Sequence, residues 1–299
     1  MEVITRVPGS CGELVQGNIA GTTFHISCPV DLYSTVRVKY VADGGPGIRF
    51  NQEARNVDKT RKAIRKTLEY FKADSRKLRL EVSMQSELIP ALGMASSTAD
   101  ITAAIVSTAL LLGKEVNLEL IKNLALQVEP TDGVFIPGIA LFDHLRGKMM
   151  LSIGEVPSIP ILIFNSGREV ETVEFNTRRN LERLNRTKEN QVKEACKLAV
   201  KGIKENDWAL AGRGAGISAL ANQQILFKPG LEELLEWADE REDIPGINVA
   251  HSGSVIGVLL KEEARVEKVK TEIQKNISEL DFLFQSRIIN GGIRTARLC

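Results

Sequence analysis

The segment IPALGMASSTAD, Ile89–Asp100, is the most informative stretch of the chain. A proline and a glycine open a tight turn, and Ser96 and Ser97 follow. Residues 78–84 before the turn alternate apolar and polar side chains, which predicts a strand, and the apolar run Ala99–Leu112 predicts a helix. A strand, a glycine turn, serines and a helix start together present backbone N–H groups and the positive end of the helix dipole to an anion.

This arrangement leaves two interpretations open. The turn is either a phosphate-binding loop, in which the hydroxyls of Ser96 and Ser97 contact phosphate or Mg²⁺, or the start of a core helix capped by serine. It is not a Walker loop, because the segment lacks GxxxxGK[ST] and no lysine adjoins the serines.

Composition excludes several classes of protein. The chain has 299 residues, of which 43% are hydrophobic and 26% charged, and this is ordinary for one large or two modest globular domains. A formal net charge of +1 gives no overall attraction to nucleic acid or an acidic membrane. No apolar run approaches the length of a membrane-spanning helix, and the start MEVITRVPGS does not resemble a secretory signal. We therefore expect a cytoplasmic protein whose partners are small molecules.

Cysteines and histidines give little information at this stage. The four cysteines, at positions 11, 28, 196 and 299, show no CxxC spacing, and we expect reduced thiols. Cys11 and Cys28 are more typical of small packed residues than of nucleophiles. The three histidines, at 25, 144 and 251, are too scattered for an argument from metal-ligand spacing.

Hydrophobic periodicity predicts an α+β protein without the βαβ rhythm of a Rossmann fold. The expected strands cover residues 3–7, 33–41, 78–84, 139–142, 161–164, 280–284 and 287–290. The expected helices cover 56–73, 97–112, 118–129, 178–204, 207–221, 230–241 and 262–275. A glycine and a proline within 149–158 place a domain boundary there, giving domains 1–155 and 156–299.

Three glycine-containing loops are expected to act together: Pro8–Gly17, Ile89–Asp100 and Gly246–Gly257. A fourth piece, VEPTDG, places Glu129 in the last turn of its helix, where a carboxylate opposes the helix dipole. Glu129 is therefore either a cation ligand or a surface acid with a small penalty. Asp132 precedes a glycine, so it either has a chemical role or closes a turn.

Seven motifs in order carry a family resemblance. They are SCGE (10–13), SCPVD (27–31), YSTV (33–36), MASSTAD (94–100), EPTD (129–132), LFDH (141–144) and NVAHSGSV (248–255). The set resembles the GHMP small-molecule kinases, and within them the L-threonine kinases of cobalamin side-chain synthesis. The turn 90–93 is one residue shorter than in that family, and segment 165–176 differs from its usual form.

The resemblance implies an N-terminal domain like ribosomal protein S5 domain 2 and a ferredoxin-like C-terminal domain. It also implies that ATP and Mg²⁺ act with L-threonine in the cleft between them. Homoserine or serine as the acceptor, a non-catalytic metabolite sensor, and a decarboxylase of the same fold are the alternatives.

The resemblance also assigns roles to residues. The phosphate loop would comprise Gly93, Met94, Ala95, Ser96, Ser97 and Thr98. Ser97 and Glu129 would hold Mg²⁺, and Asp132 would receive the proton of the acceptor hydroxyl. Glu13 and Asp31 are candidates for the substrate ammonium, while His251, Ser252 and Gly253 would line the cleft. His251 either contacts substrate or only bonds to backbone, and His144 is expected to be structural.

Overall fold

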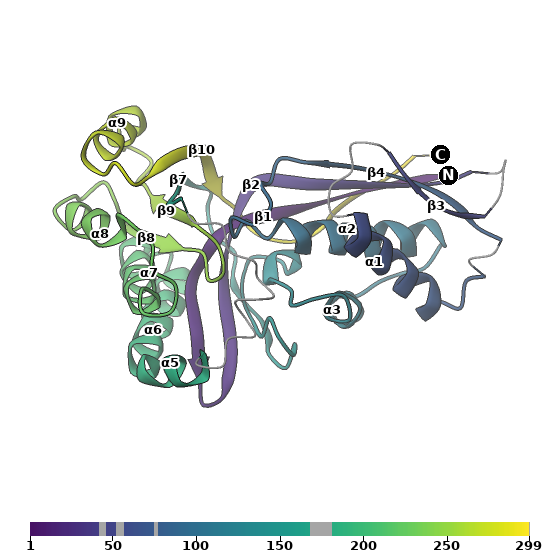
Figure 1. Ribbon diagram of the computed structural model, residues 1–299, viewed down its shortest axis with the longest axis horizontal. Helices are drawn as coiled ribbons and strands as arrows, with labels where there is room; N and C mark the ends of the chain where they lie inside the picture. Colours follow the sequence, from purple (N-terminus) through teal and green to yellow (C-terminus); the bar gives the residue numbers. More distant parts are fainter. Residues whose placement is uncertain (42–45, 52–56, 75–76, 168–180, 299) are drawn as a thin grey trace.

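The computed structural model describes residues 1–41, 46–51, 57–74, 77–167 and 181–298 (Figure 1). Its strands are β1 (Glu2–Ile19), β2 (Thr22–Tyr40), β3 (Gly47–Phe50), β4 (Arg79–Ser86), β5 (Ile139–Phe142), β6 (Met150–Gly154), β7 (Ile159–Asn165), β8 (Gly246–Val249), β9 (Val255–Leu259), β10 (Asp281–Ile288) and β11 (Arg294–Leu298). Its α-helices are α1 (Val57–Tyr70), α2 (Ser96–Leu111), α3 (Leu118–Leu126), α5 (Leu181–Thr187), α6 (Glu189–Glu205), α7 (Trp208–Asn222), α8 (Leu231–Asp239) and α9 (Val266–Asn276), and Gly133–Phe135 form a 3₁₀ turn. None of the helices in these ranges is long and apolar enough to cross a membrane.

A long antiparallel hairpin of β1 and β2 runs from the termini to the middle of the molecule and then bends toward its turn near α5 (Figure 1). Its pairs run from Glu2↔Lys39 near the termini to Ile19↔Thr22 at the turn. Ala20 and Gly21 make this turn with φ angles of 51° and 80°. Positive φ at both residues is the geometry that joins strands with the native twist. The hairpin contacts α2 as well as α6 and α7.

The described strands join in one sheet of 11, in the order β11-β1-β8-β9-β7-β10-β2-β4-β3, with β5 paired to β2 and β6 paired to β5. Helices α1, α2 and α3 cover the sheet at the end where the termini lie, and α5 to α9 gather at the other end (Figure 1). The last strand, β11, returns to pair with the start of β1, from Glu2↔Leu298 to Arg6↔Arg294. The boundary between residues 155 and 156 remains a prediction.

Helix α2 is buried along nearly its whole length, because its Ala, Ile, Val and Thr side chains pack against β1, β2 and α1. Two polar side chains fix its register on the sheet. Ser107 Oγ donates to Thr5 Oγ1 at 2.7 Å, and Asp100 accepts a hydrogen bond from Ser34 Oγ. A second apolar cluster, with Leu162, Phe164 and Leu234 fully buried, lies between β7–β9 and helices α8 and α9.

Two predicted loops are regular structure. Residues 8–17, expected as a loop, belong to β1, and register shifts near Gly9 and Glu13 mark bulges that keep the backbone irregular there. Residues 246–257, also expected as a loop, form β8, a turn and β9. The glycines misled the prediction, because bulges and close packing place glycine inside strands.

Other boundaries also differ from expectation. The helix expected over 178–204 is two helices that break at Lys188, and residues 178–180 lie outside the described ranges. The helix expected to end at Glu129 ends at Leu126. The strands expected at 280–284 and 287–290 are the single strand β10, and β11 was not predicted.

Candidate active site

The three glycine-containing segments meet at the middle of the hairpin. The backbone N–H groups of Ser254 and Val255 both donate to the carbonyl of Leu92 at 3.0 Å. From β1, Gly12 N donates to Gly93 O at 3.2 Å and Ser10 N donates to Met94 O at 3.0 Å. Segments far apart in the sequence therefore share one backbone network around the turn that precedes α2.

Close packing at this junction requires glycine. A Cβ on Gly93, whose φ is +88°, would lie 2.3 Å from Ala250 Cβ. A Cβ on Gly253 would lie 2.3 Å from Gly93 N. Because both distances are below van der Waals contact, any side chain at either position would push the turn after β8 away from the loop before α2.

The start of α2 has hydrogen-bond donors of the kind that bind anions at helix starts. Ala95 precedes the helix in the left-handed conformation, with φ 54°, and supplies no side-chain cap. The first N–H groups of a helix have no partner within it. Within the described part of the chain, the buried Ser97 Oγ also lacks a hydrogen-bond partner. The serine-capped core helix is thus not what forms, and the donors fit a phosphate.

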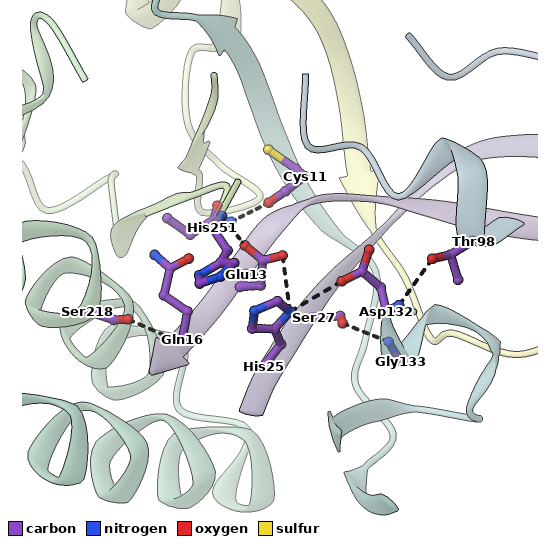
Figure 2. Close-up of polar contacts among 11 residues, drawn as sticks. Cys11, Glu13, Gln16, His25, Ser27, Thr98, Asp132, Gly133, Ser218 and His251 are labelled. Atoms are coloured by element: carbon purple, nitrogen blue, oxygen red, sulfur yellow. Dashed lines mark hydrogen bonds and ion pairs between the residues drawn. The ribbon is translucent and has the colours of Figure 1, made fainter. Parts of the chain in front are cut away.

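Two carboxylates and a histidine form the centre of the candidate site (Figure 2). His25 Nδ1 lies 3.3 Å from Asp132 Oδ1 and 3.6 Å from Glu13 Oε1. The backbone N–H of His251 donates to Glu13 Oε2 at 2.6 Å. The hairpin supplies Glu13 and His25, the segment after α3 supplies Asp132, and the turn between β8 and β9 supplies His251.

All three histidines of the chain gather here. The His25 and His144 rings are stacked with centroids 3.7 Å apart and an angle of 11°, and His251 lies 4.5 Å from His25. The histidines are far apart in the sequence, but the fold brings them together. The prediction that they are too scattered to suggest a metal site is therefore wrong. Ligand atoms of the three histidines lie within 4.8 Å of one another, as do those of Glu13, His25 and Asp132. Parallel stacked rings cannot both direct a lone pair at one ion, so the mixed carboxylate–histidine set suits a cation better.

Burial controls the ionisation of these groups. Loss of solvation raises the pKa of Glu13 well above its usual value, and the neighbouring Asp132 raises it further. Burial likewise raises the pKa of Asp132, which the His144 ring partly opposes. The pKa of His25 falls to about 3 because of burial, so its ring is neutral. The cluster holds carboxyls of raised basicity beside neutral imidazoles.

Two hydroxyl groups fix the backbone around Asp132. Its N–H donates to Thr98 Oγ1 at 3.1 Å, and the next residue, Gly133, donates to Ser27 Oγ at 3.3 Å. The Asp132 side chain is 24% exposed, so it is open to a partner on one side. Thr98, expected in the phosphate loop, thus links α2 to the backbone of Asp132.

The expected metal ligand Glu129 lies in the turn beyond α3 rather than in its last helical turn. The prediction that the Glu129 carboxylate opposes the dipole of its own helix is therefore wrong. Glu129 Oε2 lies 2.6 Å from Lys59 Nζ of α1, which neutralises it. A cation bound at Glu129 would compete with this half-exposed lysine.

The structure separates the two candidates for the substrate ammonium. Glu13 is buried in the cluster, whereas Asp31 is exposed and bonds to Tyr33. Gly253 packs against Gly93, and Ser252 precedes it in the turn between β8 and β9; that these residues line a cleft stays a prediction. The sequence interpretation missed His25, and it took the stacked His144 as structural. A correct prediction of the hairpin register would have placed His25 opposite Gln16, which follows Glu13 by three residues.

Cys11, Cys28 and Cys196 are free thiols. The first two are completely buried, and burial raises their pKa values, as expected for packed residues and not for nucleophiles.

Comparisons with known proteins agree with this geometry. The model of the GHMP kinases N terminal domain matches residues 58–138, and that of the GHMP kinases C terminal matches residues 199–279. The chain belongs to the GHMP kinase family and is a small-molecule kinase. Within that class it is 34% identical to the L-threonine kinase of Salmonella typhimurium over 264 residues, which are 86% of this chain and 82% of the relative.

Solved structures show the same fold at much lower identity. A homoserine kinase from Cytophaga hutchinsonii aligns with a TM-score of 0.71 and 16% identity, covering 99% of this chain and 97% of that one. The complex of MDDEF with MVAPP, AMPPCP and magnesium aligns with a TM-score of 0.73 and 15% identity, covering 100% and 99%. The α+β architecture with GHMP N- and C-terminal domains is thereby confirmed.

Proposed function

We propose that this kinase transfers the γ-phosphoryl group of ATP to the hydroxyl of L-threonine. The product would be L-threonine O-3-phosphate, for adenosylcobalamin side-chain synthesis in the cytoplasm. The observation that carries the proposal is the buried Glu13–His25–Asp132 cluster beside the anion-ready start of α2. The similarity to L-threonine kinases supports the choice of acceptor.

In the proposed reaction, the threonine oxygen bonds to the γ-phosphorus while the bond from that phosphorus to the bridging oxygen of ADP breaks. Asp132 receives the hydroxyl proton. Its raised pKa suits this role, because a carboxylate of higher basicity accepts a proton more readily near neutral pH. His25 Nδ1 holds the orientation of Asp132 by its contact at 3.3 Å.

The nucleotide would lie against the loop 93–98, with its phosphates on the backbone N–H groups at the start of α2. Ser97 and Glu129 would hold Mg²⁺, which when bound neutralises charge on the transferring phosphate. The unpartnered Ser97 hydroxyl and the Glu129 carboxylate are oxygen donors of the kind that Mg²⁺ prefers. The fold-related complex with AMPPCP and magnesium supports this requirement.

The other candidates differ in what they need from the site. Homoserine and serine carry the same ammonium and carboxylate as threonine, so the cluster would accept them with a different hydroxyl position. A sensor would bind nucleotide without turnover. The presence of Asp132, whose N–H donates to Thr98 and whose neighbour Gly133 donates to Ser27, argues against that role. A decarboxylase of this fold is supported by the fold alone.

A panel of acceptors tests the proposal. ADP release should be measured with L-threonine, L-serine, L-homoserine, mevalonate, a sugar, and no acceptor, with ATP and Mg²⁺ constant. We expect L-threonine to give the highest kcat/KM and the last three conditions to give background. Faster turnover of mevalonate or the sugar would overturn the assignment, and faster turnover of homoserine would correct the acceptor.

A further inference from the structure

Two lysines of the second half of the chain are buried to 2% exposure, and they differ in one respect. Lys188 Nζ donates to Asn222 Oδ1 at 3.0 Å. Lys228 Nζ has no hydrogen-bond partner among the residues that the structure describes. A buried ammonium without a partner is strongly unfavourable, so Lys228 requires an explanation other than stability.

The backbone around Lys228 is built to direct this side chain inward. The Gln223 side chain accepts from Lys228 N at 2.7 Å, and its amide donates to Lys228 O at 3.2 Å. Pro229 follows and restricts the backbone further. The preceding residue, Phe227, is 53% exposed. The turn thus buries a charged residue and exposes its aromatic neighbour, the reverse of what hydrophobic burial favours.

A second unpartnered group lies beside the Glu13–His25–Asp132 cluster. Gln16 is fully buried, and neither atom of its side-chain amide has a partner in the described part of the chain. Its backbone N–H donates to Ser218 Oγ of α7 at 3.0 Å (Figure 2). Gln16 pairs with His25 across the hairpin. Helix α7 therefore positions both groups, since Ser218 fixes Gln16 and Gln223 at the end of α7 fixes Lys228.

Lys228 and Glu13 carry opposite charges when they are ionised, so together they suit a ligand with one anionic and one cationic group. Burial lowers the pKa of Lys228 to about 7, and Glu13 partly opposes this fall; burial raises the pKa of Glu13, and Lys228 partly opposes that rise. Each charge therefore lies within electrostatic range of the other, yet no ion pair joins them among the described contacts. An α-amino acid carries an ammonium and a carboxylate that would satisfy both.

We propose that Lys228, assisted by the Gln16 amide, binds the α-carboxylate of the acceptor, so that the enzyme selects amino acids over simple alcohols. This rests on the proposed function, and it places the substrate ammonium at Glu13 and the carboxylate at the α7–α8 turn. The reacting hydroxyl then faces Asp132.

The test compares L-threonine with L-threoninamide, which lacks the carboxylate charge, in wild type, Lys228→Met and Lys188→Met. We expect Lys228→Met to lower kcat/KM for L-threonine about 10- to 100-fold, the range for a lost hydrogen bond to a charged group. Its kcat/KM for L-threoninamide should stay within about threefold of wild type. Lys188→Met, the matched buried lysine with a partner, should leave the preference for L-threonine unchanged.

Other results would overturn the proposal. An equal loss of kcat/KM with both acceptors in Lys228→Met would place Lys228 on the transferring phosphate, and an unchanged kcat/KM with both acceptors would remove it from the site. The thermal midpoint without substrate supplies an independent readout, because removing an unpartnered buried charge should maintain or raise it. A lowered midpoint with retained L-threonine preference would make Lys228 structural. Should wild type phosphorylate neither compound, calorimetric binding of both compounds still tests the carboxylate site separately from the proposed function.

Discussion

The two ends of the β1–β2 hairpin differ in the polar side chains that they bury among their apolar ones. At the end near the termini, Val3, Val7, Val36 and Val38 are fully buried beneath α2. At the other end, Glu13, Gln16 and His25 are buried against α6, α7 and the turn after β8. Apolar burial favours folding, whereas burial of polar groups without full hydrogen bonding opposes it. The end near the termini therefore stabilises the fold, and we propose that the other end binds the acceptor.

The largest expected effect is a loss of turnover when Asp132, at the polar end of the hairpin, is changed. Asp132→Asn should lower turnover about 10²- to 10⁴-fold, the range for loss of a general base. ATP binding should persist, because the start of α2 is untouched. Turnover and thermal midpoint should be measured on one preparation. A normal midpoint with normal turnover would remove Asp132 from both catalysis and turn formation.

The matched change at the apolar end should affect stability alone. Val38→Ala deletes two buried methyl groups and should lower the free energy of unfolding by about 2 kcal/mol. Turnover per folded molecule should stay near that of wild type. Urea unfolding and initial rates on the same sample check this, and a specific loss of turnover would show that the two ends are coupled.

The polar end should also make stability depend on pH. Burial lowers the pKa of His25 from its ordinary 6.5 to about 3, and the pKa values of His144 and His251 also fall. Below pH 6.5 the histidines bind protons in the unfolded chain but not in the folded protein. The contribution of the neutral, buried histidines to the free energy of unfolding is therefore complete above pH 6.5 and is lost as pH falls toward 3. Glu13, with a raised pKa, contributes in the opposite direction, because its stabilising contribution is lost as pH rises above 4.5.

The His25→Gln variant measures how much the His25 imidazole contributes to the pH dependence of stability. The stability advantage of wild type over this variant should shrink on acidification below pH 6.5, at most by about 1.4 kcal/mol per pH unit. Unfolding at several pH values between about 5 and 8 measures this difference. A difference that is constant over this range would mean that His25 does not titrate as its burial implies.

The smallest effect concerns Lys59, whose pair with Glu129 is half-exposed on the lysine side. Lys59→Met should change the free energy of unfolding by less than about 1 kcal/mol, as is usual for such pairs. If Glu129 holds Mg²⁺, removing the competing ammonium should lower the Mg²⁺ concentration for half-maximal rate.

Glu129→Gln should instead lower turnover strongly, and an unchanged Mg²⁺ dependence in both variants would remove Glu129 from the metal site.

Local patterns allowed part of this site to be predicted. The turn 89–95 and its helix follow from glycine, serine and apolar spacing within one segment. The role of Glu13 rested on a motif that the sequence interpretation read as a loop. Its neighbours Gln16 and His25 have no local signal, because only the register of a strand pair brings them together. Lys228 also escaped notice, since burial of a lysine depends on tertiary contacts that composition does not encode.

The central claim is that the polar end of the hairpin is the acceptor site, and binding of L-threonine to Glu13→Gln tests it most directly. Glutamine keeps an acceptor oxygen for His251 N–H, so the change removes the charge and little else. Calorimetry should be done with a non-hydrolysable ATP analogue and Mg²⁺ present. The account predicts that Glu13→Gln binds L-threonine about 10- to 100-fold more weakly than wild type, with an unchanged thermal midpoint or a higher one. Equal affinity in the two proteins would contradict it.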